Sequence, residues 1–194
     1  MDNQEEILEF IQKYSFATVV TSQNGIPVAT HLPIISERRG DKLILISHFA
    51  KANPQWRDIE NGKLLVIFSE PHAYISPSNY EKIQEVPTWN YLSVHAYGIG
   101  IIISDPKEVF SILEKTINSY EAKYLNQWNT LSDQYKISMS NGIVCLEMEV
   151  TELQGKKKLS QNKTLKEKQN IIESLSKSDD GPVRTLADYM QRNA

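Results

Sequence analysis

Residues 16–48 read FATVVTSQNGIPVATHLPIISERRGDKLILISH, and this stretch decides the fold class. Two turn signals, Asn24-Gly25 and Arg39-Gly40-Asp41, separate its β-branched and apolar runs. Asn-Gly is the preferred pair for a two-residue hairpin turn. The strands predicted on either side of these turns are Phe16–Thr21, Ile26–Ile35 and Lys42–His48. Parallel strands would need long crossover connections, so these strands are expected to be antiparallel.

More strands are expected farther along the chain, at Lys63–Ser69, Trp89–Ser104 and Ile143–Val150. The segment Pro71–Pro87 between the first two is expected to be irregular, because of its prolines. Gly98 and Gly100 predict a bulge or sharp bend of the kind that barrels use. Helices are expected near the N-terminus, where Ile7, Leu8, Ile11 and Tyr14 form an apolar stripe, and then from Asp105, over about 131–140, from Thr164 and after Pro182. The sequence therefore predicts a mainly β, α+β chain: an antiparallel barrel of about six strands with peripheral helices.

Composition narrows the class of protein. The chain has 194 residues, 40% of them hydrophobic, and a net charge of −3, which argues against wholesale disorder and against a strongly basic nucleic-acid binder. Its apolar runs are too short to span a bilayer, and its acidic start does not resemble a signal peptide. We therefore expect a cytoplasmic protein with no membrane contact. Cys145 is the single cysteine and no two histidines lie within four residues, so no metal site is expected.

One segment is strongly basic. Residues 155–168 carry six lysines and one acid, a local charge of +5. Such a segment suits a bound phosphate group at least as well as a DNA backbone. The alternative is a solvated surface loop, which is the usual role of a charge run.

Two other clusters have both a binding and a structural interpretation. The aromatic cluster contains His72, Tyr74, Tyr80, Trp89, Tyr91, His95 and Tyr97. Its flat rings suit stacking on a flat ligand, but such residues also fill barrel ends and subunit interfaces. A strand end with Ser47, His48, Lys51 and Asn53 suits a phosphate, or it is a polar loop that packs through Trp56.

Five blocks of this sequence together resemble the PaiB family of FMN-binding transcriptional regulators, named for repressing protease production and sporulation in bacilli. The blocks are Ala29–Pro33 (ATHLP), His48–Trp56 (HFAKANPQW), Pro71–Pro77 (PHAYISP), Val86–Tyr91 with Val94-His95 (VPTWNY and VH), and Lys158–Lys163 (KLSQNK). They occur in the family's order, and the resemblance extends from about Ile7 to Arg192.

The resemblance implies an FMN-binding split β-barrel that forms a homodimer with flavin at the subunit interface. It implies that residues 1–155 form the barrel domain, and that 156–194 supply a basic segment and helices packed on the barrel or on the partner, in a single domain overall. The cofactor-binding residues expected from it are Thr30, His31, Leu32, Pro33, Ser47, His48, Lys51, Asn53, Trp89, Asn90, Lys158 and Gln161. The first four would lie along the isoalloxazine ring, the next four would face the phosphate, and the last four would close the site.

Two functions from different classes remain open at this point. The family implies a repressor of transcription, but no two predicted helices share the tight turn of a helix-turn-helix. Direct DNA contact would then use the basic C-terminal segment, repeated across a dimer. The alternative is a flavin-dependent oxidoreductase or flavin reductase acting on a small molecule, in which His31, His72 or His95 donates a proton. No catalytic residue is assigned from the sequence.

Overall fold

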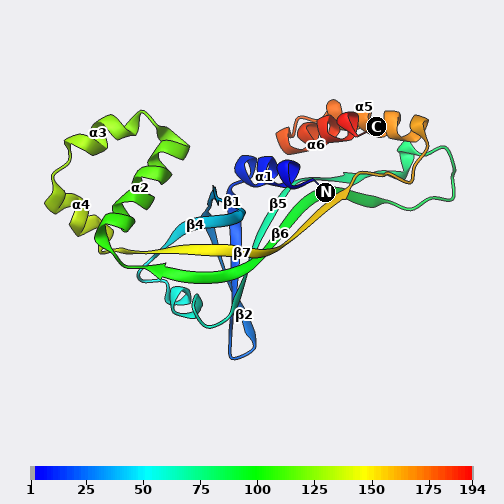
Figure 1. Ribbon diagram of the computed structural model, residues 1–194. Coiled ribbons are helices and arrows are strands. Elements are labelled where there is room, and N and C mark those ends of the chain that lie inside the picture. The colour runs from blue at the N-terminus through cyan, green and yellow to red at the C-terminus, as the bar shows by residue number, and fades with distance from the viewer. Residues whose placement is uncertain (1–2, 194) are drawn as a thin grey trace. The chain divides into compact units, whose positions relative to one another are not determined.

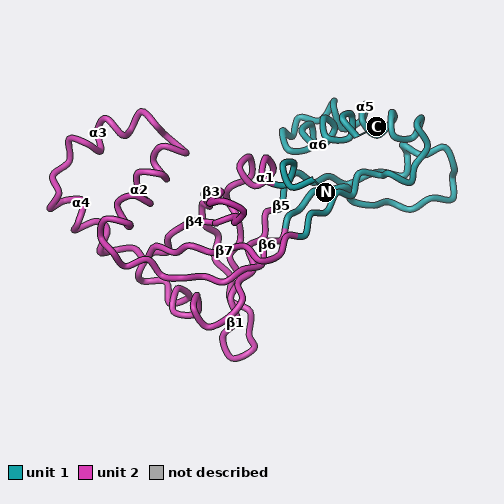
Figure 2. The backbone as a smooth tube through the Cα atoms, viewed as in Figure 1, with its two compact units in different colours: residues 1–7, 69–94, 154–194 teal, residues 8–68, 95–153 magenta. Residues whose placement is uncertain are grey.

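The computed structural model describes residues 3–193. By its internal contacts the chain divides into two compact units, which Figure 2 colours separately. Unit 1 contains residues 1–7, 69–94 and 154–194, and unit 2 contains residues 8–68 and 95–153. Because strands of the sheet run through both, the units are not successive segments of the chain.

The described residues form one seven-stranded sheet (Figure 1). Its strands are β1 (Phe16–Gln23), β2 (Ile26–Pro33), β3 (Ile35–Arg39), β4 (Lys42–Ala50), β5 (Lys63–Ile75), β6 (Thr88–Ile103) and β7 (Ile143–Lys158). The helices are α1 (Gln4–Lys13), α2 (Pro106–Glu121), α3 (Tyr124–Thr130), α4 (Asp133–Ser140), α5 (Leu165–Ser176) and α6 (Gly181–Arg192), with 3-10 turns η1 (Pro54–Asp58) and η2 (Pro77–Asn79). The spatial order is β2-β1-β5-β6-β7-β4-β3, and β1 pairs antiparallel with both β2 and β5. The predicted antiparallel α+β class is confirmed.

The first hairpin forms as its turn chemistry predicts. Asn24 and Gly25 both have positive φ, 52° and 80°, as a two-residue hairpin turn of this type requires. Their strands pair in register from Gln23 opposite Ile26 to Phe16 opposite Pro33. β2 is an edge strand, so it has no second neighbouring strand. The N–H groups that Pro27 and Pro33 lack are therefore not missed by hydrogen bonds to such a neighbour.

The expected strand over 26–35 is wrong in one respect, because it is two strands. The backbone N–H of Ile34 bonds to the carbonyl of Ser15, 2.8 Å away, at the point where β2 ends. The chain then leaves β1, and Ile35 begins β3 opposite Ile46 of β4. This change of partner raises the predicted six strands to seven.

Two strands are longer than predicted. β5 continues to Ile75, beyond its expected end at Ser69, with His72 and Tyr74 exposed and Ala73 and Ile75 buried in strand alternation. β7 continues from Val150 to Lys158, so the first three lysines of the basic segment lie in a strand and not in a loop.

One helix, α3, was not expected from any sequence pattern.

One hydrophobic cluster of unit 2 lies between the sheet and α2. Ile44 and Ile46 of β4, Cys145 of β7 and Ile112 of α2 are buried together. Asp105 fixes the start of α2, since its carboxylate accepts hydrogen bonds from the N–H groups of Lys107 and Glu108 at 2.9 and 3.1 Å. The predicted helix start at Asp105 is therefore confirmed.

In unit 1, α5 and α6 pack against each other through buried apolar side chains. These are Ile171 and Leu175 of α5 and Leu186, Ala187 and Met190 of α6. Leu165, the first residue of α5, is 75% exposed. Within the described residues no helix combines the length and the apolar character needed to cross a membrane.

Candidate functional site

Eight of the twelve predicted site residues lie in unit 2. Thr30, His31, Leu32 and Pro33 end β2, Ser47 and His48 belong to β4, and Lys51 and Asn53 lie in the turn between β4 and η1. The other four, Trp89, Asn90, Lys158 and Gln161, lie in unit 1. The predicted set is therefore divided between the two units.

Three polar side chains join the end of β2 to the turn after β4. The amide nitrogen of Asn53 donates to the Thr30 hydroxyl over 2.9 Å, and that hydroxyl donates to Oε1 of Gln55 over 2.5 Å. Asn53 also caps η1, since its Oδ1 accepts from the backbone N–H of Gln55. The structure thus brings Thr30 and Asn53 into direct contact.

Gln55 completes this network, although no pattern in the sequence pointed to it. Its side chain is 2% exposed, and its Nε2 donates to the carbonyls of Val19 and Val28, both 3.0 Å away. A buried side-chain amide with three hydrogen bonds fixes β1, β2 and η1 to one another. It therefore holds the turn that carries Lys51 and Asn53.

Two predicted residues, Ser47 and His48, lie next to each other in β4. The Ser47 hydroxyl donates to the carbonyl of Pro33 over 2.7 Å, so these two predicted residues are in contact. His48, the next residue, is half-buried, and this burial lowers the pKa of its imidazole. At neutral pH the ring is therefore uncharged and carries one N–H donor and one acceptor.

Lys51 is the exposed cation of this site. Its backbone is fixed, because its N–H donates to the carbonyl of Gly142 at 2.8 Å and its own carbonyl accepts from the Trp56 indole at 3.1 Å. Within residues 3–193, its ammonium group has neither a carboxylate nor a hydroxyl partner. A fixed backbone with an unpaired ammonium group is suited to binding an anion.

Next to this end of β2 is an exposed pair of rings. The rings of Phe16 and His31 are nearly parallel, with centroids 6.2 Å apart and an interplanar angle of 25°. Phe16 is 68% exposed, although phenylalanine is among the residues most often buried in folded proteins. A flat ligand or a protein partner would bury this apolar area.

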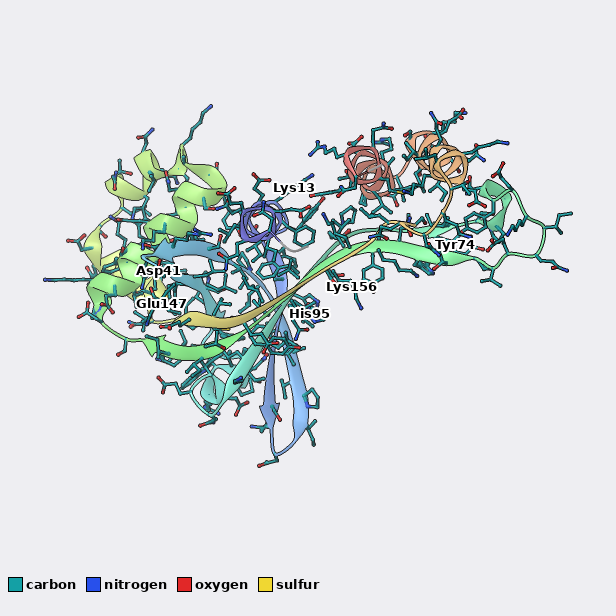
Figure 3. The ribbon with its side chains drawn as sticks, turned by 45° about the vertical axis from the view of Figure 1, so that its right-hand side comes forward. Lys13, Asp41, Tyr74, His95, Glu147 and Lys156 are labelled. Atoms are coloured by element: carbon teal, nitrogen blue, oxygen red, sulfur yellow. The ribbon has the colours of Figure 1, made fainter. Side chains whose placement is uncertain are left out.

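The aromatic cluster of the sequence does not form a single group. In unit 1, Trp89 is 53% exposed and lies near His72 and Tyr74, at centroid distances of 5.9 and 6.0 Å. Figure 3 shows Tyr74 and Lys156 on the side of the ribbon that faces away from α5 and α6. Tyr80 belongs to a separate pocket, and His95 and Tyr97 belong to unit 2.

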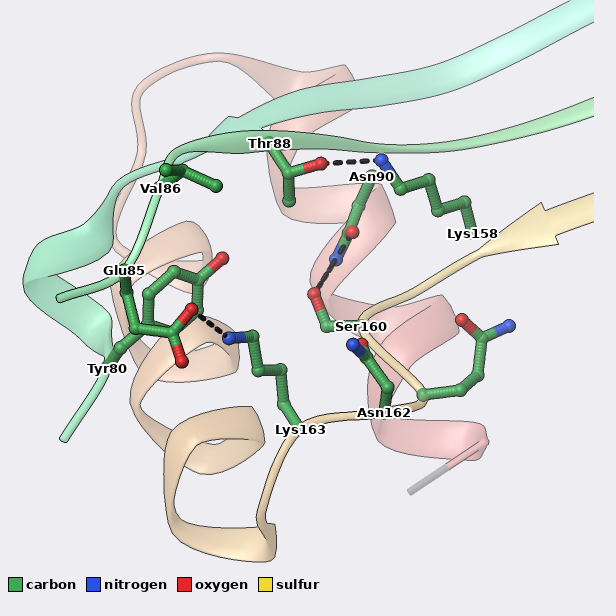
Figure 4. Close-up of a pocket in the computed structure, with 10 residues that line it drawn as sticks. Tyr80, Glu85, Val86, Thr88, Asn90, Lys158, Ser160, Asn162 and Lys163 are labelled. Atoms are coloured by element: carbon green, nitrogen blue, oxygen red, sulfur yellow. Dashed lines mark hydrogen bonds and ion pairs between the residues drawn. The ribbon is translucent and has the colours of Figure 1, made fainter. Parts of the chain in front are cut away.

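Three of the four predicted residues of unit 1 line one pocket of about 250 Å³ (Figure 4). They are Asn90, Lys158 and Gln161, and the other lining residues are Tyr80, Glu85, Val86, Thr88, Ser160, Asn162 and Lys163. Trp89 does not line it, because successive strand residues point to opposite faces. The pocket is built from the segments Tyr80–Asn90 and Lys158–Lys163.

Hydrogen bonds hold the walls of this pocket together. Asn90 is fully buried and exchanges two hydrogen bonds with the Ser160 hydroxyl, at 3.0 and 3.1 Å. Lys158 donates to the Thr88 hydroxyl over 2.5 Å. Lys163 pairs with Glu85 at 2.9 Å and lies 3.8 Å from the centroid of the Tyr80 ring, so its charge is compensated.

The residues of these two sites that were not predicted are only weakly indicated by the sequence. Ser160 and Lys163 belong to the block KLSQNK, which was singled out as a whole, and Tyr80 belongs to the aromatic cluster. Gln55 has no signal, because a glutamine after a proline reads as an ordinary exposed turn residue. Among residues 3–193, no group of three or more metal-ligating side chains comes together.

Comparison with known proteins shows what the chain is similar to. A family model described as "Putative FMN-binding domain" matches residues 1–152. The protease synthase and sporulation protein PAI 2 of Bacillus subtilis is 39% identical over 192 residues, which cover 97% of this chain and 92% of that protein.

Solved structures share the fold at low sequence identity. The flavocytochrome Anf3 from Azotobacter vinelandii has a TM-score of 0.64 at 17% identity, covering 81% of this chain and 68% of that one. An FAD- and heme-binding protein from Mycobacterium smegmatis has a TM-score of 0.63 at 16% identity, covering 81% and 72%. The predicted split-barrel class is thereby confirmed.

Proposed function

We propose that this chain, which belongs to the FMN-binding domain family and is a PaiB-type protein, acts as a flavin-binding transcriptional regulator. The predicted family is confirmed by the match over 1–152 and by the 39% identity to PAI 2. The predicted cofactor, FMN, is the one that defines the family. What remains for proposal is where FMN binds, in which assembly, and with what consequence.

The eight predicted residues of unit 2 suit the two ends of FMN. Lys51 offers an unpaired ammonium for the phosphate, and the neutral His48 offers one donor and one acceptor. Thr30, Ser47 and Asn53 are already bonded within the protein, so they support the site by fixing its shape. The exposed Phe16–His31 pair offers a flat apolar surface next to Leu32 and Pro33 for the isoalloxazine ring.

FMN would supply the redox chemistry, and the residues of this chain would bind and orient it. Lys51 would hold the phosphate, and the end of β2 would exclude water from the ring. The expected role of Trp89 stays a prediction. Asn90, Lys158 and Gln161, expected to close the flavin site, line a pocket within unit 1.

The assembly that we propose is a homodimer with flavin at its interface. Large apolar side chains of unit 2 are exposed on strands, where a second subunit would cover them. They are Phe16, Ile26, Ile99 and Ile101, each more than half exposed. The dimer is tested by sedimentation equilibrium, with and without FMN.

Direct DNA contact is the less well supported part of the regulator proposal. Of the six lysines in 155–168, Lys157 pairs with Glu6, Lys163 with Glu85 and Lys166 with Glu81. These ion pairs halve the free positive charge, on which non-specific DNA affinity depends. A regulatory role through a protein partner therefore agrees better with the charge distribution.

The observation that carries the flavin site is the unpaired Lys51. Replacing it in Lys51→Ala should weaken FMN binding about tenfold, the effect of losing one charge-assisted phosphate contact. Affinity is measured by the quenching of flavin fluorescence. The matched control is Lys63→Ala, an exposed lysine at the start of β5 in the same unit. Equal FMN affinity of both variants would refute this placement of the phosphate.

A further inference from the structure

The pocket of unit 1 contains a buried hydroxyl with no partner. Tyr80 is 9% exposed, and its OH group is buried without a hydrogen bond among the described residues. In Figure 4 this hydroxyl points into the space between Val86, Thr88 and Asn90. A buried donor without a partner is costly, so a ligand that accepts its hydrogen bond would be favoured.

The same pocket contains a lysine whose charge is not compensated. Lys158 donates to the neutral Thr88 hydroxyl, and no described residue supplies a carboxylate to it. The lining carries two lysines against one glutamate, and Glu85 is already paired with Lys163. The pocket therefore has an excess positive charge at Lys158.

The backbone at the base of this pocket is strained. Ser160 has a φ of 56°, in the left-handed region that residues other than glycine rarely adopt. Gln161 maintains this conformation, because its side chain accepts from the N–H of Leu159 at 2.9 Å and donates to the carbonyl of Lys157 at 2.7 Å. Strain of this kind is retained mainly at binding and catalytic sites.

The size of the pocket limits what it holds. Its volume of about 250 Å³ is below the range of pockets that bind drug-sized ligands. It is therefore suited to a phosphate or carboxylate group with a short carbon chain rather than to a whole FMN molecule. Its donors, the Tyr80 hydroxyl, the Lys158 ammonium and the exposed Asn162 amide, are groups that bind oxyanions.

We infer that this pocket is a binding site for a small oxyanion, a phosphate monoester or a short carboxylate, separate from the flavin. The inference goes beyond the proposed function, because it gives the regulator a second, metabolite-sized ligand. Lys158 supplies the charge, Tyr80 donates the hydrogen bond that it lacks in the unliganded chain, and Ser160 with Asn90 fixes the floor. This assigns Lys158, Asn90 and Gln161 to the oxyanion and not to the closing of the flavin site.

The test is a calorimetric titration of the full FMN-loaded chain with potassium phosphate, against potassium chloride at equal ionic strength. We expect wild-type binding, at least tenfold weaker binding by Lys158→Met, and severalfold weaker binding by Tyr80→Phe. Tyr80→Phe removes only an unpartnered hydroxyl, so its unfolding temperature should not fall. The matched control, Lys156→Met, changes an exposed lysine of the same strand that does not line the pocket and should bind as the wild type does.

Three results would overturn the inference. They are no phosphate binding by the wild type, an equal loss in Lys156→Met and Lys158→Met, or phosphate binding that depends on Lys158 in the flavin-free chain and is lost when FMN is loaded. The last result would make the pocket part of the flavin site. A parallel titration with succinate separates the two sources of the oxyanion. Phosphate binding that depends on Lys158 in a chain that binds no FMN would support this inference while refuting the proposed function.

Discussion

At the scale of single residues, Gln55 is a buried polar side chain of unit 2 with three hydrogen bonds. From the turn η1, its side-chain amide forms hydrogen bonds with Val19, Val28 and Thr30. Replacing it in Gln55→Leu keeps its volume but removes the donor to the carbonyls of Val19 and Val28. We expect a loss of about 2 kcal/mol in the free energy of unfolding, from chemical denaturation. Gln127→Leu, at an exposed position of α3, should change it by less than about 0.5 kcal/mol.

Cys145 provides a second test at this scale. It is 1% exposed, and burial raises the pKa of its thiol to about 11. At pH 8 about one thiol in a thousand would be ionised, and the thiolate is the reactive form. We expect no reaction with a disulfide reagent in the folded chain within minutes, and one thiol per chain in denaturant. Rapid labelling of the folded protein would contradict this burial.

At the scale of elements, the start of α5 depends on a carboxylate. Glu167 accepts from the backbone N–H groups of Glu81 and Thr164, which lowers the pKa of its carboxyl below the ordinary value of 4.5. The folded state therefore gains stability from the ionised form. This gain is complete above the unfolded pKa and disappears as the pH falls through the lower folded value.

The expected result is a stability profile that falls on acidification below about pH 4.5 and is flatter in Glu167→Gln, as followed by denaturation from pH 7 to pH 3. Glu121→Gln, at the exposed end of α2, is the control and should keep the wild-type profile. The Glu167 contribution is absent if both variants follow the same curve.

The close approach of β6 to β7 depends on glycine. A Cβ added at Gly98 would overlap the backbone carbonyl of Glu149 in the neighbouring β7. Because that atom belongs to a paired strand, Gly98→Ala should destabilise the chain by about 2 kcal/mol, measured by chemical denaturation. Gly181→Ala, at the first residue of α6, meets no atom closer than 4.0 Å and should be neutral or stabilising. A neutral Gly98→Ala would mean that the strands separate easily there.

The elements also show what sequence patterns reveal. The hairpin at Asn24-Gly25 and the capped start of α2 are local, so turn and capping chemistry predicts them. The end of β7 is not predictable in this way, because Lys156, Lys157 and Lys158 are alike in sequence. Their alternation arises in three dimensions, where Lys157 pairs with Glu6 while its neighbours are exposed. The oxyanion pocket joins residues 70 positions apart, Asn90 and Ser160, which no local pattern connects.

At the scale of the whole molecule, a meander with short turns sufficed to predict an antiparallel barrel. The two units could not be predicted, because β5, β6 and β7 each pass through both without a break in pattern. The expected division into 1–155 and 156–194 stays a prediction. So does the homodimer, for which the exposed Phe16 and Ile26 are the apolar surface.

The proposed regulator depends first on FMN binding by the residues of unit 2. The most direct test is the visible absorption spectrum of the purified protein, before and after FMN is added and the excess removed. We predict retained flavin bands, shifted from those of free FMN, at one flavin per chain, with markedly less flavin retained by Lys51→Ala than by Lys63→Ala. A colourless protein that takes up no flavin on reconstitution would contradict the account.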